Sequence, residues 1–147
     1  MRWNRSWFGQ RRFIGSIAVH KSLEQIENSA WPEPEGATSM MTRCLQLRKI
    51  PLSELTPSDL RLLISQKIGL THVLPLALET LQLDPLIETD YYRGDLLSEV
   101  LNLPNDIWDE DPTLNNMMVE VKDELSIMLE TVKDELLPKL STFEYKS

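Results

Sequence analysis

The chain has 147 residues, of which 41% are hydrophobic and 26% are charged, a balance that is typical of an ordinary folded protein rather than a disordered one. It is long enough for one hydrophobic core, and no apolar run approaches the roughly 20 residues that a membrane-spanning helix needs. The single cysteine, Cys44, excludes an internal disulfide framework and favours a reducing, cytoplasmic location.

The net charge of −8 is unevenly distributed along the chain. Residues 1–21 carry five basic residues and no acid, a net charge of +5. Residues 22–83 carry five basic and seven acidic residues (−2), and residues 84–147 carry five basic and sixteen acidic residues (−11). The acidic second half favours a positively charged partner and disfavours direct nucleic-acid binding, because contacts with phosphate need Lys and Arg.

The first 18 residues combine arginines with aromatic residues and show neither helical periodicity nor capping signals. A less favoured interpretation takes Arg11-Arg12-Phe13 as a twin-arginine export signal. We favour translation upstream of the true start, because Val19 can be encoded by GTG, an alternative bacterial start codon. We therefore expect residues 1–18 to be a disordered or non-native basic extension, and residues 19–147 to form a single helical domain.

Helical segments separated by proline-rich turns are predicted from Ser22 onward. Ser22 and Gln25 form the pattern of a capping box, which predicts a short helix through about Asn28. Residues 31–39 contain two prolines and are expected to be a loop. A second helix is expected over residues 39–49, where apolar residues recur at helical spacing and a proline follows at position 51.

The middle of the chain contains the clearest helix signals. Residues 56–59 (Thr-Pro-Ser-Asp) are a strong helix start, because the threonine can cap the helix and proline needs no amide partner in the first turn. This helix is expected to end at Gly69. Residues 70–83 are apolar on nearly every turn, which predicts a central helix surrounded by the others, and a shorter helix follows over residues 93–102.

The longest predicted helix begins at Asp111 and Pro112, after an acidic loop built around Trp108. Its apolar residues recur at helical spacing and form one stripe: Leu114, Met117, Met118, Val121, Leu125, Met128, Leu129, Val132 and Leu136. The string VKDEL occurs at 121–125 and again at 132–136, about three helical turns later, so both copies face the same way. With no clear strand pattern, the sequence predicts an all-α compact domain of about six helices.

The sequence contains no recognisable catalytic or cofactor-binding motif. Cys44 has no second thiol or histidine at metal-ligand spacing, and five glycines leave little material for phosphate-binding loops. An enzyme would require His72 and a nearby carboxylate to line a cleft, whereas the simpler interpretation gives His72 a structural or capping role. We therefore predict a protein that is not an enzyme and that has no metal site and no cofactor.

Aromatic residues set among acids are the strongest candidates for a binding surface. Aromatic side chains supply buried area at an interface at low entropic cost, and a field of one sign speeds encounter with an oppositely charged partner. Trp108 has the alternative of lying in the core. The candidate partner-binding residues are Asp90, Tyr91, Tyr92, Asp95, Asp106, Trp108, Asp109, Glu110 and Asp111, with Asp123, Glu124, Asp134 and Glu135 as a second choice.

Several segments together resemble bacterial contact-dependent growth inhibition (CDI) immunity proteins. They are LRLLISQKIGLTHVLPLALETLQLDPL (60–86), TDYYRGDLLSEVL (89–101), KSLEQIE (21–27), LRKIPLSELTPSDL (47–60) and Trp108, so the resemblance covers most of residues 19–110. The resemblance implies a helical cytoplasmic protein that inhibits one cognate toxin, usually a nuclease, by stoichiometric binding.

The resemblance and the charge distribution favour the same function. A nuclease active site is basic because it holds phosphates, and an acidic protein can occupy it as a mimic. We therefore predict an immunity protein that neutralises a basic toxin tip of ribonuclease type as a monomer in a 1:1 complex, without binding nucleic acid or membrane itself. The alternative is a helical adaptor whose long final helix docks on another helix and whose acidic face serves only solubility.

Overall fold

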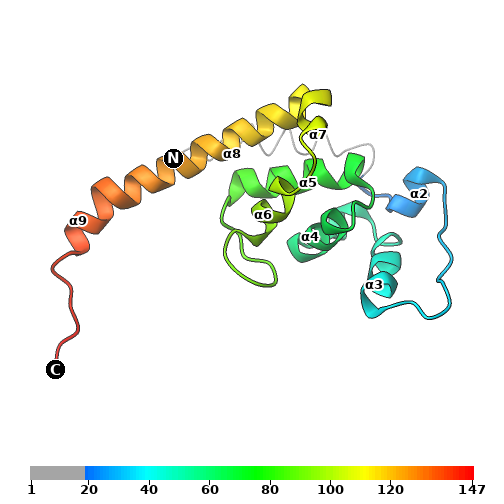
Figure 1. Cartoon of the computed structure of the whole chain (residues 1–147), viewed down its shortest axis with the longest axis horizontal. Coiled ribbons are helices and arrows are strands. Elements are labelled where there is room, and N and C mark those ends of the chain that lie inside the picture. The colour runs from blue at the N-terminus through cyan, green and yellow to red at the C-terminus, as the bar shows by residue number, and fades with distance from the viewer. Residues whose placement is uncertain (1–18) are drawn as a thin grey trace.

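The computed structural model describes residues 19–147 and has the all-α architecture that the sequence predicts (Figure 1). The elements in chain order are α2 (Leu23–Glu27), α3 (Ser39–Leu47), the 3-10 turn η1 (Leu52–Glu54), α4 (Pro57–Ser65), α5 (Leu70–Leu83), α6 (Asp95–Leu101), α7 (Asp106–Glu110), α8 (Pro112–Glu130), the π-helical segment η2 (Thr131–Leu136) and α9 (Leu137–Leu140). Within these residues the only β-type pairings are the isolated bridges Ser22–Pro51 and Glu88–Arg93.

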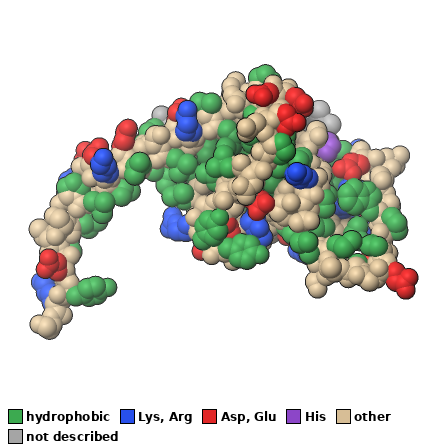
Figure 2. Space-filling model, in the orientation of Figure 1, with side chains coloured by type: hydrophobic (Ala, Val, Ile, Leu, Met, Phe, Trp, Pro, Cys, Tyr) green, Lys and Arg blue, Asp and Glu red, His purple; other side chains and the backbone are tan. Residues whose placement is uncertain are grey.

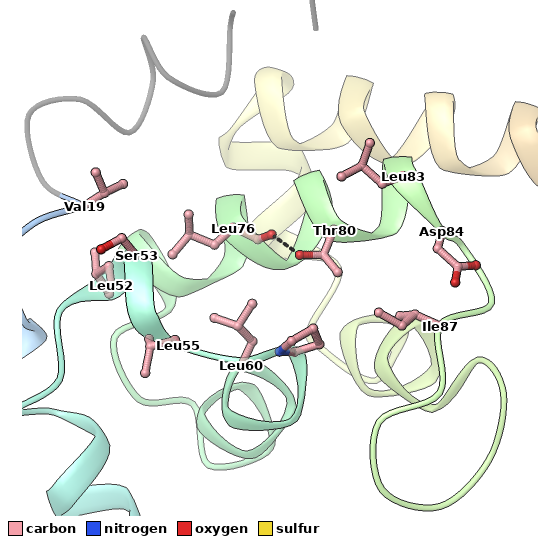
Figure 3. Close-up of a pocket in the computed structure, with 11 residues that line it drawn as sticks. Val19, Leu52, Ser53, Leu55, Leu60, Leu76, Thr80, Leu83, Asp84 and Ile87 are labelled. Atoms are coloured by element: carbon pink, nitrogen blue, oxygen red, sulfur yellow. Dashed lines mark hydrogen bonds between the residues drawn. The ribbon is translucent and has the colours of Figure 1, made fainter. Parts of the chain in front are cut away.

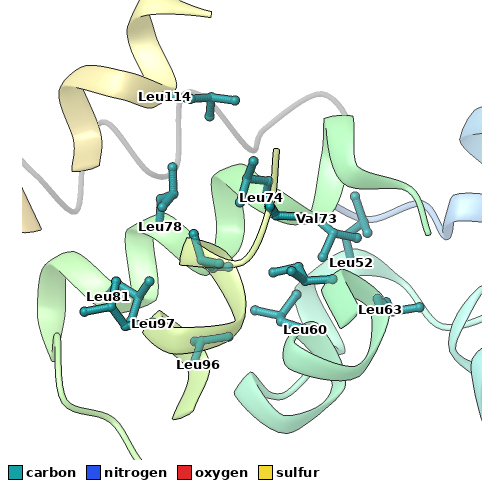
Figure 4. Packing of buried hydrophobic residues seen from close by; sticks show 14 of the residues in the cluster. Leu52, Leu60, Leu63, Val73, Leu74, Leu78, Leu81, Leu96, Leu97 and Leu114 are labelled. Carbon is teal, nitrogen blue, oxygen red and sulfur yellow. The ribbon is translucent and has the colours of Figure 1, made fainter. Parts of the chain in front are cut away.

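Helix α5 is the centre of the hydrophobic core, as its composition predicts. It packs against α4, α6 and α8, and its residues Val73, Leu74, Ala77, Leu78 and Leu81 are all buried. Figure 4 shows leucines of α4, α6 and α8 converging on this helix. Because complete burial of one leucine contributes about 1.5–3 kcal/mol, this cluster is the main source of stability of the fold.

Two helix starts follow the capping patterns that the sequence shows. Ser22 and Gln25 exchange side-chain and backbone hydrogen bonds at the start of α2, and Thr56 and Asp59 do the same at the start of α4. Each reciprocal pair satisfies two backbone amides that would otherwise have no partner inside the helix. These contacts fix where the chain enters α2 and α4.

A buried arginine connects the first helices. Arg48, 1% exposed, lies at the end of α3 and donates hydrogen bonds to the Glu27 carboxylate (2.7 Å) and to the Ser29 carbonyl oxygen (2.6 Å). Its guanidinium also lies 3.8 Å from the centre of the Trp31 ring. Because a buried charge needs paired hydrogen-bond partners, Arg48 ties α2 and the following loop to α3.

The prediction that the helix starting after Thr56 ends at Gly69 was wrong. Helix α4 ends at Ser65, Lys67 adopts a left-handed conformation (φ 56°), and Gly69 (φ 61°) is instead the N-cap of α5. A Cβ atom on Gly69 would lie 2.6 Å from Leu23 Cδ2. Glycine is therefore required here both by the left-handed backbone and by the close approach of α2.

The acidic segment before α8 also differs from its prediction, because it is the helix α7 rather than a loop. The amides of Trp108 and Asp109 donate to the Asn105 carbonyl oxygen, which closes the first turn. Ile107 and Trp108 are half-buried and pack against the core cluster. Burial of these two apolar residues on one side favours the helical turn over an open loop.

The long C-terminal helix packs on the body only over its first half. Leu114 and Val121 are buried, and Met117, Met118 and Leu125 pack against the core, whereas every residue from Leu129 onward is exposed. Figure 1 shows this second half extending well beyond the other helices. We call residues 129–147 the arm, and the predicted apolar stripe continues along it without cover from the body.

The π-helical segment in the arm has a local cause. Pro138 cannot donate a hydrogen bond to the carbonyl oxygen of Asp134, four residues earlier, and its ring crowds that carbonyl. A helix adapts to such a proline by widening one turn, which is what η2 does directly before it.

No helix in residues 19–147 is long and apolar enough to cross a membrane. The predicted extension, residues 1–18, lies outside the described residues.

Candidate partner-binding site

The segment between α5 and α6 forms a tightly organised turn around one buried carboxylate. We call residues 88–95 the tyrosine turn. The carboxylate of Asp95, 3% exposed, accepts hydrogen bonds from the amide of Thr89 (2.9 Å), its hydroxyl (2.7 Å), and the amides of Asp90 and Tyr91 (2.9 Å each). Burial by itself would raise the pKa of Asp95, but these hydrogen bonds outweigh it and hold the pKa far below its usual range.

A second carboxylate fixes the turn to α4. Asp90 accepts hydrogen bonds from the Ser58 hydroxyl (2.6 Å) and from Arg61 Nε (2.9 Å). The Ser58 and Arg61 contacts lower the pKa of Asp90 against the opposing effect of desolvation. Arg61 also lies 3.6 Å from the carboxylate of Glu99. The charge of Asp90 is thus largely matched by Arg61, so the turn is less acidic as a surface than its sequence suggests.

The rigid turn presents two tyrosines to solvent. Tyr91 is 73% exposed and Tyr92 is 53% exposed, and the Arg61 guanidinium lies 4.7 Å from the centre of the Tyr91 ring. Both tyrosines follow backbone that Asp95 holds in place, so their positions require little ordering when a partner binds. Rigid aromatic side chains of this kind are typical anchors of protein interfaces.

An apolar groove lies beside the tyrosine turn (Figure 3). It has a volume of about 420 Å³ and is lined mainly by apolar side chains of η1, α4 and α5, with Ile87 at the side that leads into the turn. Pro57 in its wall directly precedes Ser58, which bonds Asp90. The groove therefore borders the turn, and its apolar lining suits an apolar or aromatic side chain of a partner.

The other predicted cluster lies on α7. Asp106, Asp109 and Glu110 are exposed there, and Figure 2 shows acidic side chains gathered over α7 and the start of α8. Asp111 has a different role, because its carboxylate caps α8 by accepting hydrogen bonds from the amides of Thr113 (3.0 Å) and Leu114 (3.3 Å). Asp106, Asp109 and Glu110, which we call the α7 cluster, provide uncompensated negative charge without an exposed aromatic residue.

The structure separates the features that the sequence places in one surface. The tyrosine turn and the α7 cluster lie at opposite ends of α6, on opposite sides of the body in Figure 1. Exposed aromatic rings occur at the first and unpaired acids at the second, while Trp108 is half-buried against the core. Asp95 is buried, so it positions the turn rather than contacting a partner directly. A partner must span the body to engage both sites.

The second-choice acids are distributed along the final helix. Asp123 and the half-buried Glu124 lie on α8, level with the body, whereas Asp134 and Glu135 lie on the arm. Glu135 forms an exposed contact with Lys139 (3.8 Å), which contributes little because solvent screens it.

Arg61 and the groove are the parts of this surface that sequence reasoning missed. Arg61 contacts residues 29 and 38 positions away, at Asp90 and Glu99, and the leucines of the groove are indistinguishable in sequence from core leucines. The sequence carries a signal only for the turn itself, where Thr89 precedes Asp95 at the start of a helix, a pattern suited to local hydrogen bonding.

Within residues 19–147, the residues that could bind a metal ion or act in catalysis do not form a site. No group of three or more His, Cys, Asp or Glu side chains there is arranged to hold a metal ion. Cys44 is buried, and desolvation raises the pKa of its thiol, which is the opposite of what a reactive cysteine needs. His72 lies in the first turn of α5 and is half-buried.

The fold and its surfaces define a helical protein whose outstanding exposed features are suited to binding another protein. A family model described as CDI immunity proteins matches residues 25–118. Because this match covers more than half of the chain, the protein belongs to the CDI immunity protein family, which gives it an immunity role against CDI toxins. The matched segment extends from α2 into α8 and stops before the arm. No curated protein and no solved structure matches the chain.

Proposed function

We propose that this protein neutralises one cognate CDI toxin domain, a basic nuclease of ribonuclease type, by forming a 1:1 complex in the cytoplasm. The protein acts by occupying the toxin surface and carries out no chemistry of its own. The observation that carries the proposal is the tyrosine turn, a preformed aromatic surface inside the segment that the family model matches. The α7 cluster adds the long-range attraction that a basic partner would feel.

The charge distribution supports a basic partner that approaches the body. Residues 84–128 carry twelve acids and two basic residues, a net charge of −10, whereas the arm carries four acids and three lysines, a net charge of −1. Most of the negative charge of residues 84–147 therefore lies on residues 84–128 and little of it lies on the arm. Such a field raises the association rate of an oppositely charged protein, and the effect falls as salt increases.

The turn and the groove have a different role in this proposal. Tyr91 and Tyr92 supply contact area that is desolvated only after the partner has docked, so they govern dissociation rather than encounter. The neighbouring groove receives an apolar side chain of the toxin. Selectivity for one toxin then depends on the shape of this surface, since charge alone attracts any basic protein.

Binding kinetics separate the two roles. The pair Asp109→Lys and Glu110→Lys is expected to slow association with the toxin about tenfold at low salt and to weaken its salt dependence. The matched control is Glu35→Lys with Glu54→Lys, which makes the same charge change at exposed positions outside α7. Association that is slowed equally by both pairs, or by neither, removes the α7 cluster from the interface.

Truncation of the tyrosines tests the turn. Tyr91→Ala with Tyr92→Ala is expected to accelerate dissociation at least tenfold and to leave association nearly unchanged, as loss of an anchor does. Unchanged dissociation would exclude the turn as the anchor of the complex.

A second candidate function, a helical adaptor, is favoured by one observation. The arm exposes an apolar stripe suited to docking on another helix. Under this alternative, binding to a partner would be insensitive to salt, and the two variant pairs above would bind as the wild type does.

A further inference from the structure

One arginine of α4 connects the tyrosine turn to the rest of the body. Arg61 Nε donates a hydrogen bond to the Asp90 carboxylate (2.9 Å), and its Nη1 lies 3.6 Å from the Glu99 carboxylate. Asp90 belongs to the turn and Glu99 to α6, so the guanidinium is held by two elements. The Arg61 side chain is only 12% exposed, which leaves little of it for a partner to contact. Arg61 is therefore placed to act on a partner through a neighbouring side chain.

That neighbour is the ring of Tyr91. The Arg61 guanidinium lies over this ring, 4.7 Å from its centre. A guanidinium is planar and its N–H groups point outward in that plane, so its contacts with two carboxylates use its edges and leave a face for an aromatic ring. The negative potential over the ring attracts the cation. Tyr91 is thus held by Arg61 while 73% of its surface stays exposed to solvent.

This contact bears on binding because an exposed tyrosine otherwise moves between rotamers. A side chain that a partner must order loses this freedom on binding, and the loss weakens the complex. A ring that is already held avoids this loss, which corresponds to about two- to tenfold in the dissociation constant. Tyr92 differs in this respect, because it is 53% exposed and no cation lies over its ring within residues 19–147.

We propose that Arg61 is a positioning residue for toxin binding, which holds the Tyr91 ring in the orientation that the toxin contacts. The inference rests on the proposed function, because it takes the tyrosine turn as the anchor of the complex. It adds a residue that slows dissociation of the toxin without contacting it. A purely structural arginine would join α4 to α6 through the carboxylates, and the effect of its loss would not depend on the Tyr91 ring.

A double-mutant cycle on dissociation of the toxin domain encoded just upstream of the gene separates these roles. Arg61→Gln is expected to accelerate dissociation about three- to fivefold, as loss of a cation over an exposed ring does. In a Tyr91→Leu background the same substitution should add less than about twofold, whereas in a Tyr92→Leu background its full effect should remain. An effect of Arg61→Gln that is equal in the wild type and in the Tyr91→Leu background overturns the proposal.

The matched control is Arg43→Gln. Arg43 also forms an ion pair with an aspartate, Asp59 (3.1 Å), but no aromatic ring lies beneath its guanidinium within the described residues. This control removes the same charge and a similar ion pair, and it should leave dissociation within about twofold of the wild type. Equal acceleration by Arg43→Gln and Arg61→Gln would make the effect one of net charge and overturn the proposal. Circular dichroism checks that each variant is folded.

Nuclear magnetic resonance tests the contact in the free protein. Protons that lie over the face of an aromatic ring resonate upfield, so the side-chain protons of Arg61 should be shifted upfield in the wild type and lose this shift in Tyr91→Leu. Arg48, whose guanidinium lies 3.8 Å from the centre of the Trp31 ring, should keep its upfield shift in both proteins. Arg61 protons that are unchanged by Tyr91→Leu overturn the proposal, whether or not Arg61→Gln folds.

The two measurements together distinguish failure of this inference from failure of the proposed function. If Tyr91→Leu accelerates dissociation but Arg61→Gln does not, the turn remains the anchor and only the positioning role of Arg61 is overturned. If Tyr91→Leu changes the Arg61 protons but not dissociation, the turn is not the anchor, and both proposals are overturned.

Discussion

Replacing Asp95 with asparagine removes the charge that organises the tyrosine turn while changing the shape of the side chain very little. One carboxylate oxygen accepts three of the four hydrogen bonds, from the Thr89 hydroxyl and from the amides of Asp90 and Tyr91, and the other accepts the Thr89 amide. The amide nitrogen of asparagine cannot accept a hydrogen bond. At least one donor therefore loses its partner, and the remaining hydrogen bonds lose the assistance of the charge.

The cost follows from the usual strength of these contacts. Hydrogen bonds to a charged group contribute about 1.5–3 kcal/mol each, and those between neutral groups about 0.5–1.5 kcal/mol. Relief of the desolvation of a buried charge offsets part of the loss. We expect Asp95→Asn to lower the free energy of unfolding by about 2–3 kcal/mol. Urea unfolding followed by circular dichroism measures this difference.

The matched control is Asp109→Asn, which makes the same chemical change at an exposed position on α7. Its effect is expected to stay within about 0.5 kcal/mol, as for ordinary surface substitutions. Hydrogen exchange gives a local check, because the amides of Asp90 and Tyr91 should exchange faster in Asp95→Asn. An Asp95→Asn variant as stable as the control, with unchanged exchange in the turn, would refute the role assigned to this carboxylate.

Other predictions concern the same fold. Folding lowers the pKa of Asp95 below its unfolded value of about 3.9. The contribution of the Asp95 charge to the free energy of unfolding is therefore complete above that pH and is lost as the pH falls further. The difference in stability between the wild type and Asp95→Asn should stay constant from about pH 8 to 5 and shrink below about pH 4. Gly69→Ala should lower the free energy of unfolding by about 2 kcal/mol or more, because the added methyl group would contact Leu23. Gly36→Ala, also at positive φ but in open space, should lower it by about 1 kcal/mol. Equal decreases in melting temperature for the two variants would contradict this. Arg48→Met should cost about 2–4 kcal/mol in urea unfolding, and a neutral effect would show that its buried contacts are dispensable.

Local sequence signals predicted the elements whose boundaries depend on local contacts. The central helix was predicted over residues 70–83, which are its observed bounds, and the start of α4 at Pro57 follows from the capping pattern of Thr56 and Asp59. These features depend on hydrogen bonds within a few residues and on one continuous apolar segment. Both are visible in sequence without knowledge of the neighbours.

Predictions that depended on tertiary contacts were less successful. Gly69 reads as a helix end, and only the approach of Leu23 from α2 explains its use as the start of α5. The spacing of apolar residues predicted one stripe from Leu114 to Leu136, but the body covers this stripe only as far as Leu125. Sequence periodicity identifies an apolar face and does not say what covers that face.

The candidate site shows the same limit. The exposed tyrosines and the acids of α7 were selected correctly as surface residues, but their separation by α6 was not visible from their closeness in sequence. Asp95 and the exposed Asp90 look alike in sequence. One is buried as the organiser of the turn, and the other pairs with Arg61, because of contacts that bring α4 and α6 together.

We propose that this protein protects a cell by binding one cognate toxin. The most direct test is to co-express the chain with the toxin domain encoded just upstream of its gene, and with a toxin domain from an unrelated CDI system, while measuring growth and co-purification. We expect full rescue and a stable 1:1 complex with the first toxin, and neither with the second. Absence of rescue and complex with the first toxin, or equal rescue from both, would contradict the account.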